Sequence, residues 1–310
     1  MTHRLEYLIV ATIAVLVRLL PISAVRACGA AIGRIAYVAD VRHRRIAVEN
    51  LAAAFPAQSE ADRRAVVRAV FAHFGRLLLE LLKFGAMSRD EMLRRVDVEG
   101  ADRVREAYQQ GRGVLFFTGH FGYWEIHAVA HGAPGNQPLA VVARPLDNPL
   151  LEQMLDQIRR CTGNTVIYRQ GALRKILRAL AANQGVALLI DQHLITPDVV
   201  YVDFFQRPAA TTSALGSLAL RTGAPVIPVF ALPLPRGCYR LVYEVPVPPP
   251  CDDSPDAIRE FTQRCTNVLE MYVRRNPELW LWMHRRWREP DRAEPTSGAP
   301  LADEILDVDA

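Results

Sequence analysis

Apolar residues dominate the first forty positions of the chain. Residues 7–20 are apolar at all but two positions, and residues 22–41 continue largely apolar. The first of these stretches is shorter than the roughly 20 apolar residues that a spanning helix needs. We therefore expect residues 1–45 to form a membrane anchor that is tilted, hairpin-like or lies in the interface, with the basic cluster 42–45 on the cytoplasmic side. A pair of helices buried in a soluble protein would show the same pattern.

Beyond this segment, helical and strand patterns alternate. Residues 62–84 repeat apolar side chains every three or four positions, which predicts an amphipathic helix. We expect strands at residues 114–117, 139–143, 165–168, 186–190, 226–232 and 239–245, the last with the alternation of an edge strand. We expect further helices at residues 101–110, 150–161, 173–180 and 256–275. The alternation predicts an α/β domain over residues 46–288, with a mixed, mostly parallel sheet and helices on both faces.

A histidine follows the most apolar of these strands. His120 comes shortly after residues 114–117, and sites in open α/β sheets lie beyond the carboxyl ends of strands. Glu125 opens a helical segment five residues later, so a loop between the two would let carboxylate and imidazole meet. A carboxylate holding Nδ1–H leaves Nε2 free as a general base, which makes His120 and Glu125 the candidate catalytic pair. A solvated loop histidine and an ordinary first-turn glutamate are the alternative interpretation.

Other polar side chains also follow predicted strands. Arg144 and Arg169 each come directly after one, where a guanidinium group could hold phosphate or stabilise an oxyanion. Asp191 and Gln192 follow a further buried strand, where the carboxylate could orient a substrate or an arginine. Solvent-exposed arginines and a capping or turn aspartate would have the same local sequence.

Composition narrows the classes of partner. Half of the 310 residues are hydrophobic and the net charge is +4. This combination favours an anionic membrane surface or a phosphorylated lipid, and the absence of nucleic-acid-binding signatures argues against nucleic acid. The five scattered cysteines lack a C-x-x-C pair, which indicates a reducing compartment. The acidic, proline-rich tail 289–310 is expected to be disordered.

Several common catalytic motifs are absent from the sequence. It contains no G-x-S-x-G, no H-E-x-x-H, no G-x-G-x-x-G opening a helix and no P-loop. What remains is a base without a protein nucleophile. Its natural use is to deprotonate a substrate hydroxyl that attacks an activated acyl group directly. We expect no metal and no organic cofactor.

An ordered set of motifs resembles a known family. The segment from His120 to Glu125 is similar to the H-x4-D/E motif of the membrane-bound glycerolipid acyltransferase superfamily. The other matching segments are Arg144–Pro149, Asp191–Gln192, Phe204–Phe205, Ala209–Thr212 and Trp280–Trp287. Together they resemble the lipid A late (lauroyl/myristoyl) acyltransferase family over most of the chain. Gln206 stands where many relatives carry glycine, which leaves the loop conformation there open.

The resemblance implies an O-acyltransferase of the bacterial inner membrane, with its active site on the cytoplasmic face. It would move a fatty acyl chain from an acyl carrier protein thioester to a hydroxyl of a lipid A precursor, with His120 as base and Glu125 as its orienter. The acyl carrier protein and an anionic membrane lipid acceptor are the implied partners.

The resemblance also assigns substrate-binding residues. The family's Arg-x-x-x-Asn-Pro pattern falls on Arg144 and Asn148, and a family arginine falls on Arg169. Asp191 and Gln192 match the family's DQ or DH pair. We interpret residues 280–287 as an aromatic, cationic helix that lies in the headgroup layer or docks on the core.

Two alternative functions stay open at this point. Related acyltransferases use other acceptors, such as phosphatidylinositol mannoside, ornithine lipid or lysophospholipid. A non-catalytic protein that binds membrane lipid on the same scaffold would also have this sequence pattern.

Overall fold

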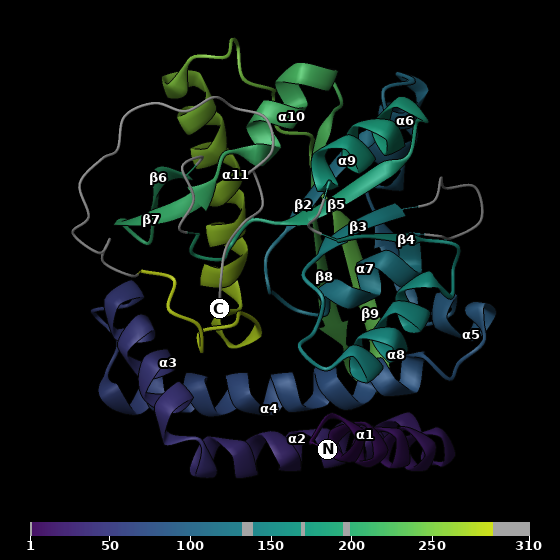
Figure 1. Ribbon diagram of the computed structural model, residues 1–310. Helices are drawn as coiled ribbons and strands as arrows, with labels where there is room; N and C mark the ends of the chain where they lie inside the picture. Colours follow the sequence, from purple (N-terminus) through teal and green to yellow (C-terminus); the bar gives the residue numbers. More distant parts are fainter. Residues whose placement is uncertain (1, 132–138, 169–170, 195–198, 288–310) are drawn as a thin grey trace.

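The computed structural model describes residues 2–131, 139–168, 171–194 and 199–287. The expected disordered tail lies outside these ranges. A seven-stranded sheet forms the centre of the molecule, and long N-terminal helices lie along one side of it (Figure 1).

The central sheet has the predicted character. Its strands are β1 (Val96–Glu99), β2 (Val114–Thr118), β3 (Leu139–Ala143), β4 (Thr165–Tyr168), β5 (Gly185–Leu189), β8 (Val226–Leu234) and β9 (Cys238–Tyr243). They lie in the order β1-β9-β8-β2-β5-β3-β4. Within this described sheet, neighbouring strands are parallel except for β8 and β9. The prediction of a mixed, mostly parallel sheet is therefore confirmed.

Strand β2 lies near the middle of the sheet and is buried on both faces. Leu115 and Phe117 belong to one hydrophobic cluster, whereas Val114 and Phe116 belong to another. Successive side chains of a strand point to opposite faces, so one apolar run serves both cores. This explains why the sequence there lacks polar alternation.

Helices cover both faces. They are α5 (Arg89–Leu93), α6 (Ala101–Gln109), α7 (Trp124–His131), α8 (Pro149–Arg160), α9 (Ala172–Ala181), α10 (Ala214–Thr222) and α11 (Pro255–Arg275), with short 3-10 helices η1 (Pro235–Gly237) and η2 (Pro277–Leu279). Buried residues of α9, α10 and α11 share a cluster with Phe117, and those of α6 and α7 share a cluster with Phe116.

The N-terminal region is a helical layer. It consists of α1 (Thr2–Leu19), α2 (Ile22–Ala39), α3 (Val41–Ala54) and α4 (Glu60–Phe84). Among the described residues, Ile22–Ala39 is the one helix that is long and apolar enough to cross a membrane by these criteria alone. The boundary expected between residues 45 and 46 falls inside α3, so it does not separate two elements.

Helix α2 packs directly along α4. Gly29 of α2 lies against the backbone of α4, since a Cβ built there would be 2.6 Å from the carbonyl oxygen of Gly75. Arg26 of α2 also forms a 3.4 Å ion pair with Glu80 of α4. The expected anchor is thus joined to the body of the molecule through backbone contact and charge.

The structure corrects the interpretation of two C-terminal segments. Strand β9 is not an edge strand, because the short strand β1 pairs with its outer side. Residues 280–287 do not form the expected helix but an irregular segment after η2, in which Trp280 and Trp282 are fully buried. Packing of these two rings in the core, and not a helical repeat, therefore determines the backbone there.

A small hairpin was not predicted from the sequence. Strands β6 (Val199–Phe204) and β7 (Arg207–Thr212) pair in antiparallel fashion, with Phe205 and Gln206 as the connecting loop. Both loop residues have positive φ, at 55° and 59°. This backbone matches a type I′ turn, which favours Gly, Asn or Asp at both positions. The loop carries none of these residues, so the usual sequence signal for a hairpin is missing.

Candidate active site

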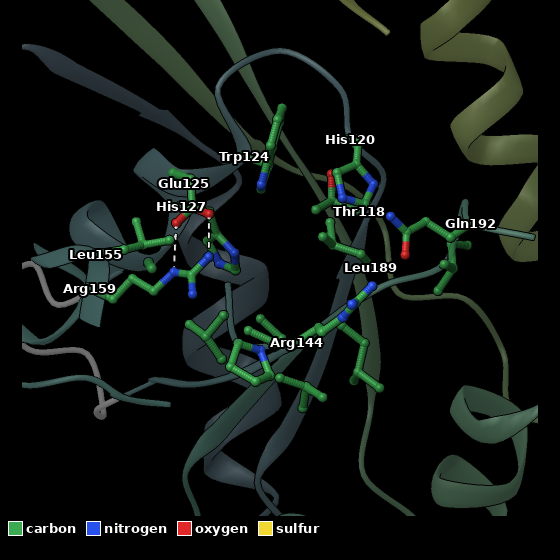
Figure 2. A pocket seen from close by; sticks show the side chains of 18 of the residues that line it. Thr118, His120, Trp124, Glu125, His127, Arg144, Leu155, Arg159, Leu189 and Gln192 are labelled. Carbon is green, nitrogen blue, oxygen red and sulfur yellow. Dashed lines mark hydrogen bonds and ion pairs between the residues drawn. The ribbon is translucent and has the colours of Figure 1, made fainter. Parts of the chain in front are cut away.

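A pocket of about 570 Å³ lies at the carboxyl ends of β2, β3 and β5. Four of the predicted site residues line it, namely His120, Glu125, Arg144 and Gln192, and Asp191 stands in the chain between the lining residues Ile190 and Gln192. Its remaining wall is largely apolar, with side chains from β3, β5 and α8 (Figure 2). The strand-end positions predicted from the sequence therefore converge on one cavity.

His120 is held by Asp191. The Nδ1 atom of His120 lies 2.8 Å from Oδ1 of Asp191, and the backbone N–H of His120 donates to Oδ2 at 2.6 Å. The predicted partner, Glu125, makes no such contact, so the expectation that it holds Nδ1 is wrong. None of the described residues hydrogen-bonds to Nε2 of His120, which lines the pocket.

Sheet register explains why Asp191 is the partner. Thr118 of β2 pairs with Leu189 of β5, so His120 and Asp191 stand two residues beyond the paired ends of neighbouring strands. Gly119 permits the close approach, because a Cβ there would be only 2.8 Å from Oδ2 of Asp191.

Burial and charge set the protonation of this pair. Burial opposes the charged form of His120, but the charge and hydrogen bond of Asp191, together with the charge of Glu125, outweigh it and raise the pKa of His120 above its usual 6.5. Burial likewise opposes ionisation of Asp191, yet His120 and the other donors hold the pKa of this carboxyl below its usual range. The imidazolium is thus stabilised by a permanent carboxylate.

Glu125 pairs with an arginine instead. Its two carboxylate oxygens accept from Nε and Nη2 of Arg159 at 3.0 and 2.6 Å (Figure 2). Glu125 lies in the first turn of α7 and Arg159 in the last turn of α8. Their side chains are 12% and 10% exposed, so this is a largely buried, bidentate ion pair that forms one side of the pocket.

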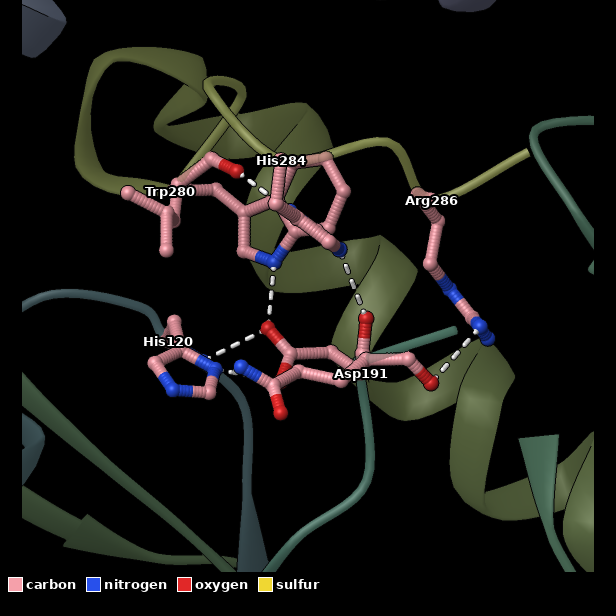
Figure 3. A network of polar contacts seen from close by, with 7 residues as sticks. His120, Asp191, Trp280, His284 and Arg286 are labelled. Carbon is pink, nitrogen blue, oxygen red and sulfur yellow. Dashed lines mark hydrogen bonds and ion pairs between the residues drawn. The ribbon is translucent and has the colours of Figure 1, made fainter. Parts of the chain in front are cut away.

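The C-terminal segment fixes the Asp191 carboxylate. Trp280 donates its Nε1–H to Oδ2 at 2.8 Å, and Nε2 of His284 lies 3.0 Å from the backbone oxygen of Asp191 (Figure 3). Arg286 is buried and donates to the backbone oxygen of Gln192 at 3.2 Å. The tryptophan-rich segment, which the sequence placed either in the headgroup layer or against the core, therefore packs on the core and supports the Asp191 carboxylate from behind.

The same segment also holds the histidine loop. The backbone N–H of Leu281 donates to the oxygen of His120 at 3.0 Å, and the N–H of Gly122 donates to the oxygen of Leu279 at 2.8 Å. Phe121 and Trp280 form an isolated β-bridge between these hydrogen bonds. His120 and Asp191 are thus tied to one another and to a common third segment.

The remaining predicted residues have different positions. Arg144 lines the pocket with a side chain that is 58% exposed and 3.3 Å from Asp147. Asn148 does not line it, because this buried side chain caps α8 by accepting from the N–H of Leu150 and donates to Glu6 of α1 at 2.8 Å. Its expected substrate-binding role is therefore replaced by a structural one. Gln192 lines the pocket, and Arg169 lies outside the described residues.

Three further polar atoms, on residues that line the pocket, were not predicted from the sequence. Thr118 Oγ1, His127 Nε2 and Arg159 Nη1 are buried and have no hydrogen-bond partner among the described residues. Burial holds the pKa of His127 well below its usual 6.5, so this imidazole is neutral. Unpaired buried polar atoms are costly, and each of these atoms belongs to a residue that lines the pocket. No local sequence signal distinguishes them, because their lack of a partner arises from packing.

Within the described part of the chain, no group of three or more His, Cys, Asp or Glu side chains is arranged to hold a metal ion.

A histidine held by a carboxylate, at a pocket of an α/β domain, has the geometry that a general base requires. The model of the bacterial lipid A biosynthesis acyltransferase family matches residues 1–289, and the chain belongs to this family. The resemblance seen in the sequence motifs is thereby confirmed.

Individual relatives support this membership. The chain is 28% identical over 279 residues to the lipid A biosynthesis lauroyltransferase of Escherichia coli K12, a match that covers 89% of each protein. It is 27% identical over 270 residues to the myristoyltransferase of the same organism, covering 86% of this chain and 82% of the relative. It is also 25% identical over 226 residues to a phosphatidylinositol mannoside acyltransferase of Mycolicibacterium smegmatis, covering 72% of each.

Proposed function

We propose that this protein is an O-acyltransferase that moves a fatty acyl chain from an acyl carrier protein thioester to a hydroxyl of a lipid A precursor. The observation that carries the proposal is the pairing of His120 Nδ1 with Asp191 at 2.8 Å, while Nε2 has no partner among the described residues. Family membership and the named relatives support the acyl transfer and the lipid A acceptor.

His120 acts as the general base and then as the general acid. Its Nε2 takes the proton of the acceptor hydroxyl while the hydroxyl oxygen attacks the thioester carbonyl. The tetrahedral intermediate then collapses, the C–S bond breaks, and the leaving thiolate takes the proton from Nε2. Asp191 stabilises the transient imidazolium and keeps its Nδ1–H in place. No protein nucleophile takes part.

The opposite side of the pocket binds oxygen atoms of the reactants. There Arg159, which lines the pocket, would donate to an oxygen that becomes negative in the tetrahedral intermediate. Glu125 keeps the Arg159 guanidinium in position through its two hydrogen bonds. Arg144 and Gln192, at the more exposed part of the pocket, are assigned to the anionic acceptor.

The protein works at the cytoplasmic face of the bacterial inner membrane. Large apolar side chains are exposed on α1 and α2, among them Leu8, Leu16, Ile35 and Val38. Because α2 packs along α4, these side chains are presented as a lateral apolar surface, which suits a helix pair lying in the interface.

The similarity to one relative favours a second kind of acceptor lipid. The similarity to a phosphatidylinositol mannoside acyltransferase supports a glycosylated phospholipid in place of the lipid A precursor, with the same chemistry at His120. Offering both acceptors to the purified protein distinguishes them.

The test is acyl transfer from a labelled carrier protein to the lipid acceptor, followed by mass spectrometry. We expect His120→Ala to lower the rate by about 10²–10⁴-fold, the usual cost of removing a general base. His43→Ala is the matched control, because His43 is exposed on α3 and pairs only with Asp40 among the described residues. A folded His120→Ala protein that turns over at the wild-type rate would show that His120 is not the base, and a folded wild-type protein that transfers no acyl group would favour a non-catalytic lipid-binding protein.

A further inference from the structure

A second hollow lies away from the pocket of His120, between α2 and α4. Arg26, Ala27, Ala30 and Arg34 of α2 line it together with Arg76 of α4. The two alanines have short side chains that leave space between the arginines. This lining contains three guanidinium groups and no carboxylate. The hollow is therefore a concentrated positive site on the surface of the helical layer.

The charges of this hollow are poorly compensated. Arg26 has one counter-ion, Glu80, at 3.4 Å, and its Nη1 atom is buried without a hydrogen-bond partner among the described residues. Tyr123 also donates to Glu80 at 2.9 Å. Burial raises the pKa of Glu80 to about 7, so this carboxyl is only partly ionised near neutral pH. Within the described chain, no hydrogen bond or ion pair holds Arg34 or Arg76.

Such a cluster is complementary to a phosphate group. Like charges that are partly withdrawn from water repel one another, and a bound anion removes this cost. Guanidinium groups match phosphate oxygens with paired hydrogen bonds, and a tetrahedral group can accept from several of them at once.

The neighbourhood of the hollow points to a lipid as the source of the phosphate. Val38 lies one helical turn beyond Arg34 and is 69% exposed, and Ile35 is 67% exposed. Cationic side chains at the border of an apolar surface are typical of the headgroup layer of a membrane.

We propose that Arg26, Arg34 and Arg76 form a binding site for the phosphate of an anionic membrane phospholipid, separate from the catalytic pocket. The site would hold the helical layer at the membrane surface with a defined orientation. This phosphate site does not depend on the acyl-transfer chemistry. Evidence against the site would therefore leave the proposed role of His120 unchanged.

The experiment measures binding to the full-length protein in a non-ionic detergent. The probes are short-chain phosphatidylglycerol, short-chain phosphatidylcholine and inorganic phosphate, titrated calorimetrically at constant ionic strength. We expect phosphatidylglycerol to bind tightest, because the apolar border adds contacts to its acyl chains. Arg34→Gln with Arg76→Gln should weaken this binding about tenfold or more, since each charged hydrogen bond contributes on the order of tenfold.

Matched controls separate a site from general positive charge. Arg42→Gln with Arg45→Gln removes the same charge from exposed positions of α3 and should leave phosphatidylglycerol binding unchanged. Arg34→Lys with Arg76→Lys keeps the charge but loses the paired hydrogen bonds, and it should bind with intermediate affinity.

Three results would overturn the proposal. Equal weakening by the α3 pair would reduce the hollow to part of a diffuse positive surface. Equal binding of phosphatidylcholine and phosphatidylglycerol would show that the negative headgroup is irrelevant. Inorganic phosphate binding as tightly as phosphatidylglycerol would identify free phosphate, not membrane lipid, as the ligand. Far-ultraviolet circular dichroism confirms that each variant is folded.

Discussion

Trp280 and His120 share one oxygen atom of Asp191. Trp280 Nε1–H and the backbone N–H of His120 both donate to Oδ2, at 2.8 and 2.6 Å, while Oδ1 accepts from the imidazole. All these donors favour the ionised carboxylate, and they fix its plane relative to the imidazole ring. The C-terminal segment therefore holds the Asp191 carboxylate in place beside the proposed base, His120.

Trp280→Phe tests this role. The substitution keeps an aromatic ring in a fully buried position but removes the Nε1–H donor. We expect acyl transfer to fall by about 10- to 100-fold, from the loss of one hydrogen bond to a charged group. Because Asp191 is then less satisfied, it should hold the proton on His120 more strongly, and the acid limb of kcat/KM should move to higher pH.

Trp282→Phe is the matched control for that variant. Trp282 is equally buried, but its Nε1–H donates to the backbone oxygen of Pro277 at 2.7 Å. Its loss should leave the acid limb where it is in the wild type. A limb that moves equally in both variants would mean that packing, and not the hydrogen bond to Asp191, is responsible.

Asp191→Asn should shift the pH profile in the opposite direction. A general base works when it is unprotonated, so the wild-type rate should rise with pH through the raised pKa of His120. Asn removes the negative charge that raises this pKa, whereas burial of the imidazole remains and lowers it. The acid limb should therefore move to lower pH, and the plateau rate should fall about 10²–10⁴-fold. An unshifted limb would contradict the pairing of His120 with Asp191.

The sequence predicted where the site residues lie better than it predicted which of them form hydrogen bonds with each other. The apolar run of β2 and β5 is visible locally, and so is the placement of His120 and Asp191 at the strand ends. That β2 and β5 are neighbours depends on sheet order, which no local pattern reveals. Proximity in sequence favours Glu125 as the partner, although α7 directs its side chain toward Arg159.

The helix predicted for residues 280–287 is wrong for a related reason. Trp280 and Trp282 are two residues apart, yet both are buried among side chains from distant elements. Packing of this kind overrides local helical preference. Asn148 shows the reverse, because it stands where the sequence predicts that a helix begins and it caps that helix, whereas the substrate-binding role implied by the resemblance is not supported by its position.

Glu125→Gln should destabilise the fold. The substitution leaves the buried Arg159 guanidinium without its counter-ion, and such a loss typically costs about 3–5 kcal/mol. The measurement is the midpoint of thermal or denaturant unfolding in detergent, converted to a free energy where the transition is two-state.

A second substitution in the same pair provides the control. Arg159→Met added to Glu125→Gln removes the unpaired charge and should recover most of the lost stability, because apolar side chains of similar size often replace a buried pair at little cost. A double variant as unstable as Glu125→Gln would show that the charge of Arg159 is not the cause.

Gln206→Gly should stabilise the β6–β7 hairpin. Gln206 has a φ of 59° in the two-residue loop, a conformation that glycine adopts without the steric cost of a Cβ. We expect a gain of about 0.5–1 kcal/mol in unfolding free energy, since glycine's greater freedom in the unfolded chain offsets part of the relief. Phe205→Gly is the contrasting variant, because it relieves a similar φ of 55° but removes a ring that is only 3% exposed. That loss should cost about 3–5 kcal/mol and outweigh the backbone gain. A Gln206→Gly protein less stable than the wild type would show that the glutamine side chain contributes more than its backbone strain costs.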